Sequence, residues 1–330
     1  MLQINADKRR STMQVFHKLE DIPAGFGPTV VSVGNFDGVH RAHRQVISNI
    51  VLRARELGAK AVAVSFEPHP LRILRPDLAL KLITPSAEKI RLLQTCGLDA
   101  VLLLPFTRDL SLVTPQQFAE DILKQRLNAR EVHEGFNFHF GHKAAGDVTL
   151  LSELGKQLGF GVHVYSEMRL RGEPVSSSHI RKLIGEGRVS RARYLLARPF
   201  SVLSTPGRGR GYGAKHTVPT INLNRYEELL PQDGVYITRT RVVEECFDSV
   251  TNVGNRPTFG ADSFAVETHL LNFHPIELTP ETEVEIYFLQ RLRDEIKFPS
   301  IEALRAQIAK DVKHARRYFH LLSWFARHGK

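Results

Sequence analysis

The hydrophobic residues in the first half of the chain follow two alternating patterns. Short runs of apolar and β-branched residues, such as PTVVSVGNF at 28–36, are typical of buried strands. Between these runs, apolar residues recur with the period of a helix, as at Val46, Ile47, Ile50 and Leu57, and Gly58 marks the end of that helix. The predicted strands are residues 28–36, 59–66, 99–106 and 129–136, and the predicted helices are residues 41–58, 86–97 and 114–128. This βαβα order predicts a parallel sheet with helices on both faces and ligands at the carboxyl ends of the strands.

After about residue 183 the pattern changes. A helical connector leads into a Gly-rich segment, TPGRGRGYGAKHTVPTINL at 205–223, and then into short alternating runs. The predicted strands are residues 233–245, 247–254, 264–273 and 283–293. Short strands at this close spacing predict a small antiparallel β-barrel.

The length of 330 residues predicts two domains. We expect a first α/β domain at 14–184, a helical connector at 185–198 and a second domain at 199–330. The second domain ends in a helix with Ser300 as N-cap. The expected inner stripe of that helix consists of Ile301, Leu304, Ile308 and Val312.

The composition is that of a soluble globular protein, with 42% apolar and 24% charged residues. No apolar run is long enough to cross a membrane, and the first residues lack the apolar core of a secretory signal. Cys96 and Cys246 lie far apart without a metal-ligand spacing, which favours the cytoplasm. The net charge of +10 favours polyanionic partners, either nucleic acid or small phosphorylated ligands. Composition alone does not separate these two classes.

The segment GNFDGVHRAH at 34–43 lies where a strand becomes a helix. His40 and His43 share one face of the first helical turn, beside backbone N–H groups that can bind a triphosphate. Nucleotidyl transfer needs such a site, because the α-phosphate must be held in line and its developing charge neutralised. By itself, a histidine pair at a helix start is more often a cap or a surface feature. Zinc binding by the pair is disfavoured, because no third ligand follows at a suitable spacing.

Four stretches in order resemble the bacterial FMN adenylyltransferases of the HxGH nucleotidyltransferase superfamily. They are GNFDGVHRAH (34–43), FEPHP (66–70), GFNFHFGHKAAGD (135–147) and VSSSHIRKLI (175–184). The resemblance implies a Rossmann-like first domain. It also implies that the ATP phosphates contact the following residues: Gly34, Asn35, Phe36, Asp37, His40, His43, Ser177, Ser178 and Arg181. Of these, it implies catalytic roles for His40, His43 and Arg181.

The same resemblance implies a flavin site. Its expected residues in this domain are Phe66, Pro68, His69, Phe136, Asn137, Phe138 and Asp147. Aromatic side chains suit the flat isoalloxazine ring, although core packing is an equal explanation for Phe138 and Phe140. One residue departs from the family pattern, since Ala42 replaces the glycine of HxGH. We expect the added methyl group to have a modest effect on ATP binding.

A second motif, VPTINL at 218–223, resembles the PTAN motif of riboflavin kinases. In an extended segment Thr220 and Asn222 point to the same side, and their oxygens can hold a Mg²⁺ ion. The resemblance implies that Glu267 in AVETHLLNF is the catalytic base for riboflavin. It also implies that Arg291 in RLRDE borders the flavin and that Lys215 contacts the nucleotide.

The glycine-rich loop of the kinase family is altered here to GAKHTVPTIN at 213–222. Two hypotheses therefore stay open. In the first, the chain is a bifunctional FAD synthetase that converts riboflavin to FMN and FMN to FAD, with ATP as co-substrate and Mg²⁺ as cofactor. In the second, the first domain is an adenylyltransferase and the barrel is a weakly active or regulatory flavin-binding module. A nucleic-acid-binding protein, which only the net charge favours, lacks a recognition motif, so the expected partners are riboflavin, FMN and ATP, without nucleic acid or membrane. The sequence does not give the oligomeric state.

Overall fold

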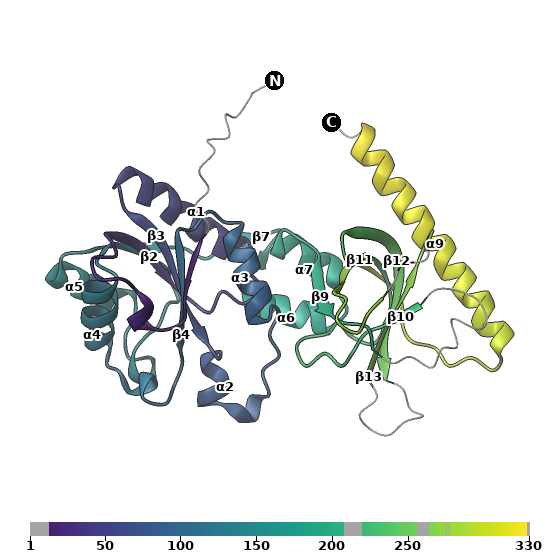
Figure 1. Ribbon diagram of the computed structural model, residues 1–330, viewed down its shortest axis with the longest axis horizontal. Coiled ribbons are helices and arrows are strands. Elements are labelled where there is room, and N and C mark those ends of the chain that lie inside the picture. The colour runs from purple at the N-terminus through teal and green to yellow at the C-terminus, as the bar shows by residue number, and fades with distance from the viewer. Residues whose placement is uncertain (1–12, 208–219, 256–263, 275, 277, 329–330) are drawn as a thin grey trace. The chain divides into compact units, whose positions relative to one another are not determined.

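The computed structural model describes residues 13–207, 220–255, 264–274, 276 and 278–328. The chain divides into two compact units, Met1–Ser177 and Ser178–Lys330. Figure 1 shows a sheet in each unit. The predicted domain boundaries remain a prediction.

The first unit is built on a six-stranded sheet in which every neighbouring pair of strands is parallel. Its spatial order is β1-β4-β3-β2-β5-β6. The strands are β1 (Gln14–Phe16), β2 (Thr29–Val33), β3 (Lys60–Glu67), β4 (Ala100–Pro105), β5 (Ala129–Gly135) and β6 (Gly161–Tyr165). The predicted parallel α/β sheet is confirmed. The edge strands β1 and β6 were not predicted, because neither carries a continuous apolar run.

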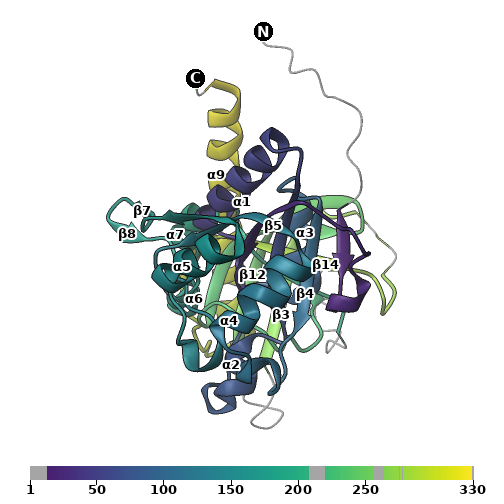
Figure 2. The same cartoon turned by 90° about the vertical axis from the view of Figure 1, so that its left-hand side faces the viewer.

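Helices cover both faces of this sheet (Figures 1 and 2). They are α1 (Arg41–Glu56), α2 (Pro70–Leu74), α3 (Ser86–Gln94), α4 (Pro115–Gln117), which continues as a π-helix over Phe118–Arg126, and α5 (Val148–Leu158). Short 3₁₀ turns lie at Leu19–Asp21, Pro76–Leu78, Leu110–Leu112 and His142–Ala144, and a two-stranded ribbon is formed by β7 (Arg169–Leu170) and β8 (Glu173–Pro174). Successive strand residues point to opposite faces. Val31 in β2 therefore packs with the π-helix and α5, whereas Val30 packs with α1 and α3.

The buried face of α1 differs in part from the predicted one. Ile47 and Ile50 are buried as expected, together with Val51 and Ala54. Leu57 was wrongly placed on this face, since it is 40% exposed just beyond the helix end. The turn that follows α1 carries it away from the sheet.

The second unit contains α6 (Ser177–Gly185), which begins at the division, α7 (Val189–Leu196) and a six-stranded antiparallel sheet. The order of strands in the sheet is β10-β13-β12-β11-β14-β9. The strands are β9 (Phe200–Ser204), β10 (Thr220–Asn222), β11 (Gly234–Val242), β12 (Glu245–Asn255), β13 (Phe264–Leu270) and β14 (Val284–Arg293). The two edge strands approach each other at a bridge between Pro206 and Leu223, so the sheet curls into the predicted small barrel.

One face of this sheet buries a ring of five hydroxyl groups. Each hydroxyl lies 2.7–2.9 Å from two others, so that each one can donate one hydrogen bond and accept one. The residues are Thr238, Thr240, Ser249, Thr251 and Thr268. Buried polar atoms satisfied in this way fix the register of β11, β12 and β13.

The terminal helix α9 (Ile301–His328) packs on the opposite face of the sheet. Ala315 and Phe319 are buried against it, and Arg293 of β14 forms an ion pair of 2.8 Å with the buried Asp311. The predicted inner stripe is wrong in its first turn, because Ile301 is 62% exposed and Leu304 is 39% exposed. The described buried residues of α9 begin at Asp311, which shows where the helix meets the sheet.

Candidate active sites

The loop at residues 34–40 lies at the topological switch point of the parallel sheet. From β2 the chain continues to β3 on one side, whereas β5 pairs with β2 on the other side. Ligands of open α/β sheets bind at such a crevice. Phe36, Gly38 and Val39 have φ values of 49°, 85° and 38°, and the side chains of Phe36 and Val39 are buried in the core. These two side chains therefore hold a tightly folded loop between β2 and α1.

The two predicted histidines stack on each other at the start of α1. Their ring centroids are 3.6 Å apart, and His40 Nδ1 accepts a hydrogen bond from the backbone N–H of His43 at 3.3 Å. His40 is therefore the N-cap of the helix, and its proton resides on Nε2 in the neutral form. Burial, with smaller contributions from His40 and Lys89, lowers the pKa of His43 well below its ordinary value. Both groups lie where the helix presents its N–H groups and positive dipole end.

Two buried polar atoms next to this helix start lack a hydrogen-bond partner within the described structure. They are Asn35 Oδ1 and His43 Nδ1. An unsatisfied buried polar group is costly, and a bound ligand is one way to satisfy it. Their position in the motif agrees with a site that a nucleotide completes.

Asp37 holds a neighbouring segment in place. Its carboxylate accepts hydrogen bonds from the backbone N–H groups of Ile83 and Thr84, at 3.1 and 2.9 Å, and from the Thr84 hydroxyl at 3.2 Å. Ser177 Oγ donates to the carbonyl oxygen of Asp37 at 2.8 Å, so the structure brings these two predicted residues together. Ser178 and Arg181 lie on α6 in the second unit. The direct contact of Asp37 with ATP remains a prediction.

Lys89 is a site residue that the sequence reasoning missed. It is buried, and its Nζ donates to Ser65 Oγ at 3.0 Å and to the Asn35 carbonyl oxygen at 3.4 Å. Burial lowers the pKa of Lys89, against the opposing effects of Glu67 and Asp37. A small cleft is lined by Lys89 together with Asn35, Asp37, Glu67, His69, Leu82 and Thr84. The available signal was a lysine on the apolar face of α3, beside Leu92 and Leu93.

The predicted flavin residues lie at the ends of β3 and β5. Phe66 is the second-to-last residue of β3 and makes an edge-to-face contact with Phe106. Pro68 follows the strand through a cis peptide bond, and His69 caps α2. After β5, Phe136 is 50% exposed and Asn137 is exposed, while Phe138 is only partly buried.

Phe140 next to them belongs to the core, where it packs against Phe118. Asp147 accepts a hydrogen bond from Leu150 N–H at 2.9 Å and caps α5. The flavin contacts of all these residues stay predictions, and core packing accounts for Phe140.

Glu134 is a second buried group that the sequence reasoning missed. It lies near the end of β5 and is 3% exposed. Its Oε1 accepts a hydrogen bond of 2.6 Å from the backbone N–H of Val33, the last residue of β2. Burial raises the pKa of the Glu134 carboxyl well above its ordinary value. A buried carboxyl whose surroundings favour its neutral form thus joins the two strands that flank the crevice.

Replacing Glu134 by glutamine is expected to make stability less dependent on pH. The unfolded chain releases the Glu134 proton near the ordinary pKa, whereas the folded protein keeps it to a higher pH. The contribution of Glu134 to stability is therefore complete below its pKa in the unfolded chain. It is lost as the pH rises through its pKa in the folded protein. Between these two pKa values, the free energy of unfolding of Glu134→Gln should rise relative to that of the wild type by about 1.4 kcal/mol for each pH unit. Chemical denaturation from acid to neutral pH measures the difference, and a constant difference would contradict the assignment.

In the second unit the predicted kinase residues lie on adjacent strands. Asn222 of β10 pairs with Glu267 of β13, which pairs in turn with Asn252 of β12. Thr220 lies on the same side of β10 as Asn222, because side chains alternate along a strand. The structure therefore places Thr220, Asn222 and Glu267 on one face, whereas the sequence predicted a shared side only for Thr220 and Asn222. Lys215 lies outside the described residues.

Glu295 lies next to this face, and the sequence did not predict it as a site residue. Its Oε1 accepts a hydrogen bond from Asn252 Nδ2 at 3.5 Å, and a Cβ atom at Gly254 would lie 2.6 Å from its carboxylate oxygens. Arg291 lies elsewhere. It pairs with Tyr236, whose side chain faces away from the Glu267 side, and it donates to the Asp233 carbonyl oxygen at 2.5 Å. The structure does not bring Arg291 and Glu267 together on one face. The predicted contact of Arg291 with the flavin stays a prediction.

Comparisons with known proteins match both units. A family described as FAD synthetase matches residues 23–179, and a family described as riboflavin kinase matches residues 196–319. None of the described helices has the length and apolar character required to cross a membrane.

Several relatives are named bifunctional riboflavin kinase/FMN adenylyltransferase. The one from Buchnera aphidicola subsp. Schizaphis graminum is 31% identical, over 93% of this chain and 98% of its own. Those from Escherichia coli K12 and Pseudomonas fluorescens are 31% and 32% identical, over 88% and 92% of this chain and 93% and 97% of their own. A solved structure from Streptococcus pneumoniae, described as a macrolide-efflux protein, is similar with a TM-score of 0.83 and 26% identity, over 93% of this chain and 99% of that one.

A nucleotidyltransferase sheet followed by a kinase barrel defines an enzyme of FMN and FAD synthesis. The chain belongs to the family of bifunctional riboflavin kinase/FMN adenylyltransferases. The resemblance drawn from the sequence motifs is thereby confirmed, as are both enzymatic activities.

Proposed function

We propose that the crevice at the start of α1 transfers the adenylyl group of ATP to FMN. A phosphate oxygen of FMN attacks the α-phosphorus, the bond between this phosphorus and the oxygen leading to the β-phosphate breaks, and pyrophosphate leaves. The stacked His40 and His43 at the helix start carry this proposal, because Nε2–H of His40 and the helix N–H groups suit developing negative charge. The unpartnered atoms Asn35 Oδ1 and His43 Nδ1 give the ligand further contacts.

The barrel phosphorylates riboflavin on the face that carries Glu267. Glu267 accepts the proton of the ribityl primary hydroxyl as its oxygen attacks the γ-phosphorus, and ADP leaves. The pairing of Glu267 with Asn222 supports this role, since it places the base beside the expected phosphate-binding residues.

The residues of β10 fit a magnesium ion. Mg²⁺ prefers hard oxygen ligands, and the Thr220 hydroxyl and Asn222 amide oxygen lie on one side of the strand. When bound, the ion neutralises charge on the nucleotide phosphates. Thr220 and Asn222 would hold it and orient the phosphates toward Glu267.

Two parallel incubations test the two reactions. Purified protein is given ATP, Mg²⁺ and either riboflavin or FMN, and the flavins are separated by chromatography. FAD from both tubes is the expected result. FAD from FMN alone would favour the alternative in which the barrel is a weak kinase, and would direct attention to residues 213–218. FAD from neither tube would contradict the proposal.

Replacing Ala42 by glycine is expected to change ATP binding only modestly. Ala42 occupies the glycine position of HxGH in the first turn of α1. Glycine there costs about 1 kcal/mol of helix stability, but it removes one methyl group from the approach to the nucleotide. The KM for ATP in the FMN-to-FAD reaction measures the balance. A much lower KM in Ala42→Gly would show that the methyl group obstructs the nucleotide.

A further inference from the structure

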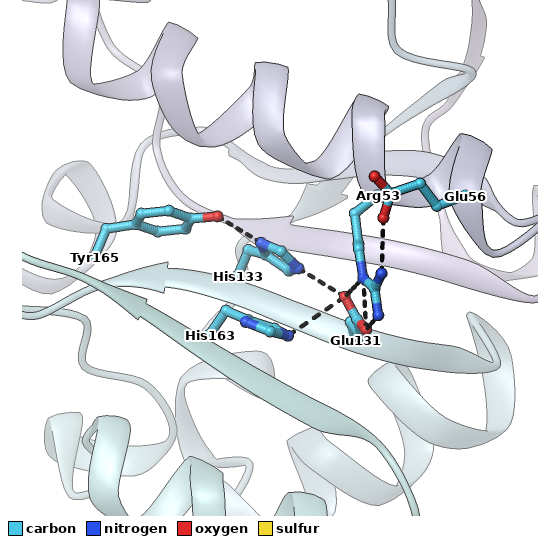
Figure 3. Close-up of polar contacts among 6 residues, drawn as sticks. All are labelled: Arg53, Glu56, Glu131, His133, His163 and Tyr165. Carbon is cyan, nitrogen blue, oxygen red and sulfur yellow. Dashed lines mark hydrogen bonds and ion pairs between the residues drawn. The ribbon is translucent and has the colours of Figure 1, made fainter.

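Three potential metal ligands meet on the sheet face beneath α1. Glu131 Oε2 lies 3.1 Å from Nε2 of His133 and 3.4 Å from Nε2 of His163, as Figure 3 shows. The three ligand atoms all lie within 4.8 Å of one another. Residues of a tetrahedral zinc site with bonds of about 2.0–2.1 Å have ligand atoms at comparable separations.

The parallel register of β5 and β6 creates this cluster. Glu131 and His133 are two residues apart on β5 and point to the same side, and His133 is the direct partner of His163 on β6. Glu131 is paired with Gly161, which has no side chain to cover the carboxylate. The two imidazole rings stack with centroids 4.4 Å apart. The sequence did not reveal the cluster, because His163 is far from the other two ligands along the chain.

A second layer of contacts orients the ligands. Tyr165 Oη lies 2.7 Å from His133 Nδ1, so it can accept that proton and leave the lone pair of Nε2 to a metal. Arg53 of α1 donates to Glu131 Oε1 through Nη2 at 2.8 Å and to both carboxylate oxygens, including Oε2, through Nε at 3.0 Å. It also pairs with Glu56 at 2.7 Å. With neutral imidazoles, the charges of Arg53, Glu56 and Glu131 sum to minus one. A cation would thus enter a site of net negative charge although an arginine stands beside it.

The cluster is open to solvent on one side and separate from the candidate active site of its own unit. The His163 side chain is 50% exposed, whereas those of Glu131 and His133 are 11% and 4% exposed. Arg53 lies thirteen residues after His40, the N-cap of α1, which corresponds to about 20 Å along the helix axis. We propose that Glu131, His133 and His163 form a binding site for a divalent transition-metal ion such as Zn²⁺. The bound ion would join β5 and β6, with solvent as its remaining ligand.

Titration of the full-length, metal-free protein with Zn²⁺ tests the site, with Co²⁺ as a spectroscopic probe. We expect one equivalent to bind, with the visible d–d absorption of tetrahedral Co²⁺ and a rise in Tm. His163→Ala should abolish this binding, and since its side chain is half exposed the variant should fold normally. Tyr165→Phe should weaken binding by about 10–100-fold, because it removes only the group that orients His133.

His17→Ala is the matched control, since His17 is an exposed histidine of the same unit outside the cluster. It should bind the metal like the wild type. Binding that survives in His163→Ala but is lost in His43→Ala would assign the metal to the histidine pair of α1 and overturn the proposal. Absence of stoichiometric binding to the wild-type protein would also overturn it. FAD formation by His163→Ala should be unchanged, which distinguishes this site from the proposed catalytic one.

Discussion

Replacement of Glu267 by alanine is expected to lower riboflavin phosphorylation by about 10²–10⁴-fold, the usual contribution of a general base. Conversion of FMN to FAD should continue at the wild-type rate, because the proposed adenylyltransferase residues His40 and His43 lie in the other unit. The measurement is the initial rate of each half-reaction, started from riboflavin or from FMN and followed by chromatography.

The fold around Glu267 is well suited to hold a base still. Its neighbour Thr268 points to the other face and belongs to the buried ring of hydroxyls, where it contacts Thr240 and Thr251 at 2.9 Å. Strand pairing with β10 and β12 fixes Glu267 from both sides. A side chain on such a rigid strand keeps its orientation between turnovers. A substitution of Glu267 should therefore change the kinase rate because it removes the carboxylate, and not because it shifts the strand that carries it.

Two further variants make the Glu267 result specific. Glu267→Gln keeps the size and hydrogen-bonding capacity of the side chain but removes the base, so it should be nearly as inactive as Glu267→Ala. Glu281→Ala removes an exposed glutamate from the same unit and should leave the kinase rate unchanged. Normal riboflavin phosphorylation by Glu267→Gln would show that the base is another group. Loss of both reactions in Glu267→Ala would indicate misfolding.

The sequence predicted the two folds well, because their strands carry local signals. The central strands β2, β3 and β4 are continuous apolar runs that are buried on both sides. Such runs are typical of a parallel sheet that is covered by helices on both faces. The edge strand β6 has the sequence GVHVY and is mostly exposed, so its run is short and interrupted by a histidine. Terminal helix α9 shows a different limit. Its apolar residues repeat from Ile301 onwards, but only tertiary packing determines that burial begins at Asp311.

The candidate site residues also fall into two groups, those that the sequence could predict and those that it could not. Residues in motifs, such as His40 and Glu267, could be predicted because their neighbours along the chain carry the pattern. Lys89 and Glu134 approach the crevice from α3 and β5, and their importance depends on contacts to Asn35 and Val33 far along the chain. Periodicity shows that such residues face inward, but it does not show what they meet there.

Replacement of His40 by alanine is expected to lower conversion of FMN to FAD by about 10²–10³-fold, the typical effect of losing one donor to a developing negative charge. Riboflavin phosphorylation should persist, so FMN should accumulate when the reaction starts from riboflavin. His40 has a second function, however, since its Nδ1 caps α1 through the N–H of His43. Loss of an N-cap costs about 1 kcal/mol, and His40→Ala alone would combine both effects.

His40→Asn separates the two functions. Asparagine is among the preferred N-cap residues, so this variant should retain the start of α1 and the thermal stability of the protein. It lacks the imidazole Nε2–H that we assign to the phosphates, and its FMN-to-FAD rate should fall as far as that of His40→Ala. A wild-type rate in His40→Asn would show that His40 acts only as a cap, and the charge of the transition state would then be stabilised by His43, by Lys89 and by the N–H groups of the helix.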